Sequence, residues 1–418
     1  MFARPILLAG ITLALAGACE ASPSPGHAAS GSRSPEPKAG PAPRAAPGGA
    51  RWYHARLEVH AQRRPLEFFL ELPAGDSGKA VVLNGTERTE FASTRKGDEI
   101  HLSADWNYVS EVRARRAADG TLAGEWRRYT PIWGHVVRGF SARPIEGPEP
   151  SRLHPGPPSQ AKVDGYWEID FERHGRSGAR FQQDGDVVTG FVRPGNLGDL
   201  RYLAGSLRGK NLTLSYFNGN AANVVGAEIS SDGNTLRGTM SMQNVWIESF
   251  TARRVTSLPP SKPVTLRPGA RKATLPEIAD LKGKPALVIF FATWCASCND
   301  ATPFLVEMHR RYGKRIAFLG LAYELNEDED ENYRQIARYR ARHEVEFEMK
   351  EIPTTPQEWA GSMPPELQGW DGLPIFLFVR PDGTVERIVG GWYSAAARDE
   401  NARLKRDFES WLNELRKS

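Results

Sequence analysis

Residues 287–298 have the sequence LVIFFATWCASC, and this stretch decides the fold of the C-terminal part of the chain. The apolar run Leu287–Phe291 is typical of a strand that is buried on both faces of a sheet. Phe304 and Met308 follow at helical spacing, which predicts a helix shortly after the run. Cys295 is therefore expected at a strand-to-helix turn.

Cys295 and Cys298 form a C-x-x-C pair at this turn. A thiolate at a helix N-terminus faces the positive end of the helix dipole and unpaired backbone N–H groups, and both lower the pKa of the thiol. We therefore expect Cys295 to be the nucleophile and Cys298, one helical turn further on, to be the resolving thiol. No second cysteine pair or histidine cluster completes four metal ligands, so we expect a redox-active disulfide with no metal and no other cofactor.

The stretch Phe290–Cys298, with Pro303 five residues after the second cysteine, resembles the active-site helix of thioredoxin-fold proteins. The sequence KGKP at residues 282–285 resembles the TlpA-like, or redoxin, branch of that family. The sequence Gly372-Leu373-Pro374 is similar to the family's cis-proline loop. These likenesses cover about residues 265–418, roughly the C-terminal third of the chain.

The resemblance implies a thiol–disulfide oxidoreductase. It implies that Pro303 kinks the active-site helix, and that Trp294, Leu373 and Pro374 line a groove for a client peptide. It also implies client proteins with disulfides or thiols, and a membrane redox partner that recycles the cysteine pair.

Two family positions that carry an acid in some relatives are apolar here, Ile289 and Ala301. Glu324, which follows the expected strand Ile316–Ala322, is a candidate substitute for proton transfer. The other interpretation is that Glu324 begins a solvated acidic loop. The pair Ala296-Ser297 between the cysteines does not assign the direction of the net reaction.

The N-terminus has the features of a secretory signal. Arg4 precedes an apolar run, Ile6–Leu15, and small residues stand directly before Cys19. We expect a signal peptide over residues 1–18 and, by resemblance to the bacterial lipoprotein box, lipidation of Cys19. Ordinary signal cleavage at Ala16-Gly17-Ala18 is the alternative. The expected location is the periplasmic side of the cell envelope, as an outer-membrane lipoprotein, or else soluble in the periplasm or secreted.

The remaining chain divides by composition. Residues 19–50 are mostly Ala, Ser, Pro and Gly, which predicts a disordered tether. Residues 51–146 and 162–256 show short alternating segments with turn residues, which predicts antiparallel strands. Similar segments recur in the same order at a spacing of about 110 residues, for example KGDEIHLSA at 96–104 and RGKNLTLSY at 208–216.

We therefore predict a multidomain chain. Two antiparallel all-β modules in tandem, joined by a Pro-rich linker at 147–161, are followed by a linker at 257–268 and an α/β thioredoxin-fold domain at 269–418. Small sandwiches and small barrels both fit the β modules. Tryptophans such as Trp126 and Trp167 could form their cores or a ligand-binding surface, and the core is the ordinary use of an aromatic residue on a strand.

The charges almost cancel, with 54 Lys and Arg against 50 Asp and Glu, so the sequence does not point to a nucleic-acid partner. The leading hypothesis is an envelope thiol–disulfide oxidoreductase. One alternative is a redoxin-type thiol peroxidase, although Ala292 stands where that family has Thr or Ser three residues before the reactive cysteine. A second alternative is a β protein that binds glycan or another envelope component and carries an accessory thioredoxin domain.

Overall fold

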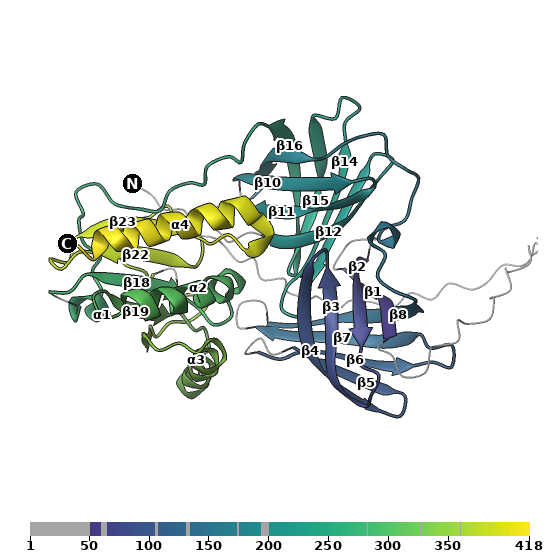
Figure 1. Cartoon of the computed structure of the whole chain (residues 1–418), viewed down its shortest axis with the longest axis horizontal. Helices are drawn as coiled ribbons and strands as arrows, with labels where there is room; N and C mark the ends of the chain where they lie inside the picture. The colour runs from purple at the N-terminus through teal and green to yellow at the C-terminus, as the bar shows by residue number, and fades with distance from the viewer. Residues whose placement is uncertain are drawn as a thin grey trace, which may run out of the picture. The chain divides into compact units, whose positions relative to one another are not determined.

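The computed structural model describes residues 51–59, 65–104, 108–130, 134–173, 175–193, 200–281, 283–326, 328–359 and 361–418 (Figure 1). The predicted signal peptide, the predicted tether and Cys19 lie outside these ranges. The described residues belong to one compact unit, Ala46–Ser418. None of the helices in the described ranges has the length and apolar character needed to cross a membrane.

The first barrel contains eight antiparallel strands that follow one another in chain order and close by pairing β8 with β1. Alternation places one face of each strand inside, so Tyr53, Ala55 and Leu57 are fully buried on the first strand. The strands are β1 (Arg51–Leu57), β2 (Leu66–Leu72), β3 (Ser77–Asn84), β4 (Glu87–Lys96), β5 (Glu99–Ser103), β6 (Ser110–Arg116), β7 (Leu122–Thr130) and β8 (Gly134–Ile145).

The second barrel has the same topology and closes by pairing β16 with β9. A short 3-10 helix, Pro150–Arg152, lies between the barrels in the sequence. Trp126 of the first barrel and Trp167 of the second are fully buried, as expected for core residues. The strands are β9 (Gly165–Phe171), β10 (Gly175–Asp184), β11 (Val187–Arg193), β12 (Leu200–Arg208), β13 (Asn211–Phe217), β14 (Ala222–Ile229), β15 (Thr235–Met242) and β16 (Trp246–Val255).

The hairpin between β13 and β14 joins the two barrels. Phe217, at the end of β13, is fully buried in the core of the first barrel, where its ring centroid lies 4.7 Å from that of Phe68 and 5.3 Å from that of Trp126. Asn84 donates a hydrogen bond to the Phe217 carbonyl at 2.6 Å and accepts one from its N–H at 3.0 Å. Gly219, in the hairpin loop, has a φ of 89°, and a Cβ atom there would lie 2.7 Å from Ala104. Each barrel has its own core, and the hairpin of the second barrel extends into the core of the first.

The C-terminal part contains a five-stranded sheet in the order β20-β19-β18-β22-β23. β18 is parallel to β19 and antiparallel to β22, so the apolar run of the sequence lies at the centre of the sheet with every residue buried. Its strands are β18 (Ala286–Phe291), β19 (Ala317–Ala322), β20 (Glu348–Glu351), β22 (Ile375–Val379) and β23 (Val385–Gly390). A separate two-stranded sheet pairs β17 (Thr265–Leu266) with β21 (Leu367–Gln368).

Helices complete the core of this part. Phe304, Ile336 and Phe408, from three different helices, belong to the same buried cluster as the central strands. Asp328 caps α3 by accepting hydrogen bonds from the N–H groups of Asp330 and Glu331. The helices are α1 (Pro276–Ala279), α2 (Ala296–Tyr312), α3 (Glu329–His343) and α4 (Arg398–Leu415), with a 3-10 turn at Ala395–Ala397.

The predicted fold class, a multidomain chain with two all-β modules followed by an α/β thioredoxin-fold domain, is wrong. The described part of the chain is mostly β, with 23 strands and four α-helices in one compact unit, and 16 of the strands form two closed barrels. Alternating patterns predict strands but say nothing of barrel closure or of a hairpin that fills its neighbour's core. Barrel closure pairs residues 79 to 93 positions apart, and Phe217 contacts Phe68, 149 positions earlier in the chain.

We expect Phe217→Ala to lower the free energy of unfolding by about 3–5 kcal/mol, because the truncation leaves a cavity in the core of the first barrel. Urea denaturation of the full chain measures the effect. Val137→Ala on β8 is the control, since Val137 is 47% exposed and its truncation should cost less than about 1 kcal/mol. Equal effects of the two substitutions would contradict the role of Phe217 in joining the barrels.

Candidate active site

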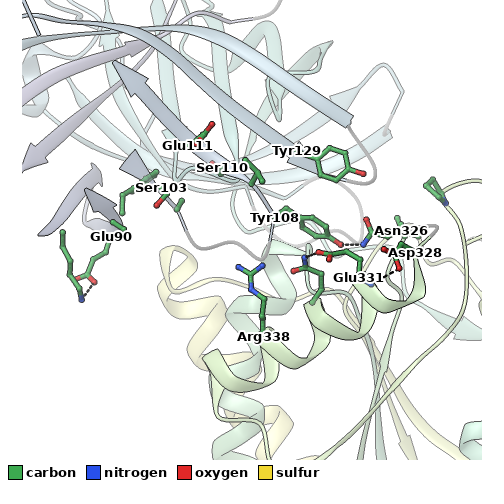
Figure 2. Close-up of a pocket in the computed structure, with 18 of the residues that line it drawn as sticks. Glu90, Ser103, Tyr108, Ser110, Glu111, Tyr129, Asn326, Asp328, Glu331 and Arg338 are labelled. Atoms are coloured by element: carbon green, nitrogen blue, oxygen red, sulfur yellow. Dashed lines mark hydrogen bonds and ion pairs between the residues drawn. The ribbon is translucent and has the colours of Figure 1, made fainter. Parts of the chain in front are cut away.

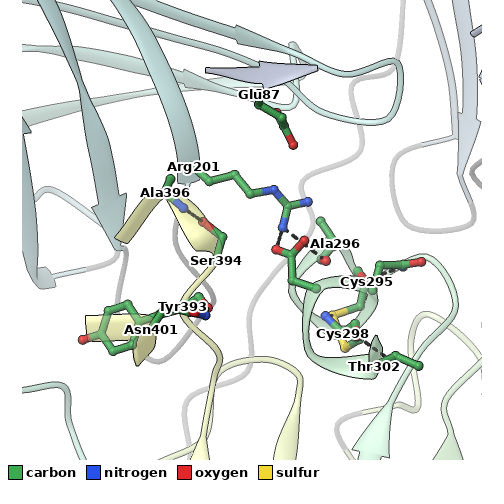
Figure 3. A network of polar contacts seen from close by, with 12 residues as sticks. Glu87, Arg201, Cys295, Ala296, Cys298, Thr302, Tyr393, Ser394, Ala396 and Asn401 are labelled. Atoms are coloured by element: carbon green, nitrogen blue, oxygen red, sulfur yellow. Dashed lines mark hydrogen bonds and ion pairs between the residues drawn. A yellow bond between two sulfur atoms is a disulfide. The ribbon is translucent and has the colours of Figure 1, made fainter. Parts of the chain in front are cut away.

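The strand-to-helix turn places Cys295 at the N-cap of α2, directly before Ala296 (Figure 3). Its Sγ accepts a hydrogen bond from the Cys298 N–H at 3.1 Å, and the two cysteines form a disulfide with a Cα–Cα distance of 5.2 Å. Cys295 is 8% exposed and Cys298 is 1% exposed. Cys298 is therefore the more enclosed of the two sulfurs. A reduced Cys295 would have the N–H groups of the first helical turn directed at its sulfur.

Asn299 fixes the shape of this turn. Its side-chain amide donates hydrogen bonds to the carbonyl oxygens of Thr293 at 3.0 Å and Cys295 at 2.8 Å. Its amide oxygen lies 3.0 Å from Nε2 of His343 on α3. Burial, together with the positive charge of Arg342, lowers the pKa of His343 to about 4, so this imidazole is neutral near pH 7.

The loop before β22 approaches the reactive cysteine. The carbonyl oxygen of Leu373 lies 3.6 Å from Sγ of Cys295, and the Leu373–Pro374 peptide bond is cis, as the family resemblance implies. The side chains of Leu373 and Pro374 are buried. Trp294 is partly buried and donates its indole N–H to the carbonyl of Tyr323 at 3.1 Å. The structure therefore brings the predicted residues of the turn and the proline loop together.

Glu324 is fully buried instead of belonging to a solvated loop. One carboxylate oxygen accepts a hydrogen bond from the Thr293 N–H at 2.7 Å, and the other accepts one from the Thr293 hydroxyl at 2.8 Å. Burial raises the pKa of Glu324 to about 7, even though the hydrogen bonds from Thr293 and Tyr108 lower it. Glu324 is thus a carboxyl group that changes protonation near neutral pH. It contacts Thr293, which stands two residues before Cys295.

The two positions that carry an acid in some relatives are buried and apolar, since Ile289 lies on β18 and Ala301 lies on α2. Pro303 stands inside α2, and its own side chain is exposed. In the described ranges, no three His, Cys, Asp or Glu side chains gather as metal ligands would.

Sequence reasoning missed two residues of the barrels that contact the site. Tyr108, just before β6, donates its hydroxyl to Glu324 at 3.1 Å and accepts a hydrogen bond from Asn326 at 3.1 Å. Arg201 on β12 donates to the Ala296 carbonyl at 3.3 Å. Each lies about 100 residues or more from its partner in the sequence, and nothing in the local pattern signals such a contact.

Tyr108 also lines a cavity of about 1130 Å³, with walls from the first barrel and from α3 and its neighbouring loops (Figure 2). Aromatic and acidic side chains are prominent in this lining. They include Phe91, Tyr108, Tyr129, Glu90, Glu111, Asp328 and Glu331. Tyr108 therefore lines the cavity and also donates its hydroxyl hydrogen bond to Glu324.

No family model matches the chain. Over 77 residues it is 34% identical to a thiol:disulfide interchange protein TxlA homolog of Synechocystis, a match that covers 18% of this chain and 41% of that protein. Part of the chain is related to thiol:disulfide interchange proteins. A second such relative, the thiol:disulfide interchange protein CycY of Rhizobium leguminosarum, is 51% identical over 41 residues, which cover 9% of this chain and 22% of that protein.

The chain spans less than half the length of these curated relatives. Among solved structures, a thiol:disulfide interchange protein of the thioredoxin family from Chlorobium tepidum has 25% sequence identity and a TM-score of 0.24, and the match covers 32% of this chain and 83% of that one. The likeness to thioredoxin-like proteins is thus limited to about a third of the chain.

The buried Glu324 predicts a pH-dependent stability. Its pKa in the folded state, about 7, exceeds the ordinary value of 4.5, so the protonated carboxyl favours folding below about pH 4.5 and this contribution is lost as the pH rises through about 7. We expect the free energy of unfolding of the wild type to fall by about 2–3 kcal/mol relative to Glu324→Gln between pH 4.5 and pH 7. Urea denaturation across this range measures it.

Glu414→Gln is the matched control, because Glu414 is exposed on α4. A difference between wild type and Glu324→Gln that does not vary with pH would show that the Glu324 carboxyl does not titrate in this range.

Proposed function

We propose that the protein is a thiol–disulfide oxidoreductase of the TlpA-like branch that exchanges disulfides with client proteins through Cys295 and Cys298. The observation that carries this proposal is the C-x-x-C disulfide at the N-terminus of α2, with the more accessible sulfur at the N-cap. The Leu373 carbonyl, 3.6 Å from that sulfur, adds a backbone acceptor of the kind that an extended client segment pairs with. The related interchange proteins agree with this chemistry.

In the reducing direction, the Cys295 thiolate attacks one sulfur of a client disulfide. A mixed disulfide forms and the client's other sulfur leaves as a thiolate. Cys298 loses its proton and attacks Sγ of Cys295, which closes the Cys295–Cys298 disulfide and releases the client's second thiolate. Two electrons pass to the client, and its two thiolates take up two protons, one that Cys298 released and one from the solvent, which had received the proton of Cys295 on ionisation. The oxidising direction is the exact reverse, and in either direction a membrane redox partner resets the pair.

Glu324 is the group that we propose accepts the Cys298 proton. It is a fully buried carboxyl with a pKa of about 7, it lies against the turn that carries Cys295, and the positions where some relatives have an acid are apolar here. A carboxyl with this pKa can both take up and return a proton near neutral pH. The bonds from Thr293 hold it in place.

We further propose an envelope location on the periplasmic side, with the signal peptide removed and Cys19 lipidated. This part of the proposal rests on the sequence of residues 1–19, namely one positive residue, a short apolar run and small residues before the cysteine. An exported compartment is oxidising, so a reductase there needs a membrane donor of electrons.

The cavity beside Tyr108 is where we propose that the client segment next to the exchanged disulfide lies. Tyr129 supports this assignment, since it is a half-buried ring on the cavity wall, 6.1 Å from the ring of Tyr108 between centroids. A tyrosine supplies a large contact area and a polar hydroxyl at little cost in conformational entropy, which suits the recognition of varied polypeptides.

Cys298→Ala tests the exchange chemistry. Without the resolving thiol, the mixed disulfide at Cys295 cannot be released, so we expect client proteins to accumulate covalently bound in the native host. Non-reducing electrophoresis followed by mass spectrometry identifies them. The double variant Cys295→Ala, Cys298→Ala is the control and should trap nothing. If Cys298→Ala traps nothing either, the proposed client exchange is refuted.

Tyr129→Ala tests the cavity in the Cys298→Ala background. We expect the yield of trapped clients to fall on the order of fivefold to tenfold, because a buried aromatic contact is lost, while the reaction with oxidised glutathione is unchanged. Val137→Ala is the control, since Val137 is exposed on β8 and does not line the cavity. An unchanged client yield, or an equal loss with glutathione, would remove the cavity from the client site.

A further inference from the structure

Arg201 reaches from the second barrel to the first turn of the active-site helix (Figure 3). Its guanidinium donates to the carbonyl of Ala296, the residue directly after Cys295, at 3.3 Å, and it forms an ion pair with Asp300. Its Nε donates to the hydroxyl of Tyr216 at 3.3 Å. The Arg201 side chain is only 4% exposed, so a permanent positive charge is held almost without water beside the redox pair.

Asp300 is the negative partner on α2, two residues after Cys298, and its side chain is 28% exposed. A carboxylate so near the start of a helix that carries a thiolate opposes the ionisation of that thiol, because like charges repel across a poorly screened distance. Arg201 offsets this repulsion and adds an attraction of its own. Arg201 therefore stabilises a Cys295 thiolate, and Asp300 destabilises it.

Two other ionisable groups of the described residues lie near the turn. Glu324 accepts hydrogen bonds from Thr293, which belongs to the turn before Cys295, and His343, neutral near pH 7, contacts Asn299. Glu87 of the first barrel lies behind Tyr216, whose hydroxyl is 3.5 Å from its carboxylate. Arg201 and Asp300 are thus the charged pair that contacts the first turn of α2 directly.

We propose that Arg201 is a positioning residue of the redox centre, through which the second barrel stabilises the Cys295 thiolate and makes the pair more oxidising. The reason is thermodynamic, since whatever stabilises the reduced, ionised form favours reduction of the disulfide. This inference rests on the proposed function in that Cys295 is taken as the nucleophile. It adds that the second barrel influences the reduction potential of the cysteine pair and is not only a spacer.

The test compares Arg201→Gln with Asp300→Asn, which break the same ion pair from opposite sides. We expect Arg201→Gln to slow alkylation of Cys295 by iodoacetamide about tenfold at a pH below the thiol pKa, and Asp300→Asn to speed it. Mass spectrometry confirms modification at Cys295. The equilibrium with glutathione should move toward the disulfide in Arg201→Gln and toward the dithiol in Asp300→Asn.

Two controls separate charge from structure. Arg201→Lys keeps the positive charge and should retain most of the wild-type alkylation rate. Arg180→Gln breaks a different ion pair between the second barrel and α4, Arg180–Asp399 at 2.7 Å, and should leave Cys295 unchanged. If Arg201→Gln and Asp300→Asn shift the alkylation rate in the same direction, or neither shifts it, the proposal is overturned.

The outcome also separates this inference from the proposed function. If wild-type Cys295 is no more reactive than an ordinary thiol, the proposed function fails. If wild-type Cys295 is reactive but the two variants do not change its alkylation rate in opposite directions, only the proposed role of Arg201 is refuted. Where Arg201→Gln does not fold, Asp300→Asn and Arg201→Lys still decide the question.

Discussion

The burial of one carboxyl group constrains the arrangement around the redox pair. Glu324 has no contact with solvent, so its oxygens must be satisfied by the protein, and the N–H and hydroxyl of Thr293 and the hydroxyl of Tyr108 do this. Thr293 belongs to the turn before Cys295, and Tyr108 belongs to the first barrel. The Thr293 and Tyr108 hydroxyls donate to the same carboxylate oxygen, so removing either one would leave this buried oxygen with one hydrogen bond in place of two, which is costly. The Glu324 carboxyl thus binds both the turn before Cys295, through Thr293, and the first barrel, through Tyr108.

The barrels are coupled to each other as well as to the site. Phe217 fills the core of the first barrel from the second, and Arg201, on a neighbouring strand of the second barrel, contacts the first turn of α2. The second barrel contacts α2 through Arg201, and the first barrel contacts Glu324 through Tyr108.

The sequence predicts the local structure around the cysteines well. The apolar run Leu287–Phe291 forms a central strand and the helix begins directly after Cys295, because a run buried on both faces and a 3.6-residue period are determined by neighbouring residues. The cis-proline loop lies directly before the strand β22, Ile375–Val379. The fold class could not be obtained in the same way. Barrel closure, the packing of Phe217 into the first barrel and the contacts of Tyr108 and Arg201 join segments far apart in the chain, and periodicity gives no information about such pairs.

Within the site, the burial of Glu324 likewise could not be predicted from the sequence. Its position after a strand makes it a candidate, but whether a carboxyl at a strand end is solvated or buried depends on what packs over it, here a tyrosine 216 residues earlier in the chain.

Ring closure of the sixteen barrel strands has a consequence for how the chain meets other copies of itself. A strand with one unpaired side is a template on which a foreign strand can grow into a mixed sheet or a fibril, and a closed ring has no such side. In the described ranges, β20 and β23 are the outer strands of the five-stranded sheet, and β20 has only four residues. Within the part of the chain that the structure describes, the barrel strands are thereby protected from cross-β aggregation, and the unpaired strand edges belong to the smaller sheets.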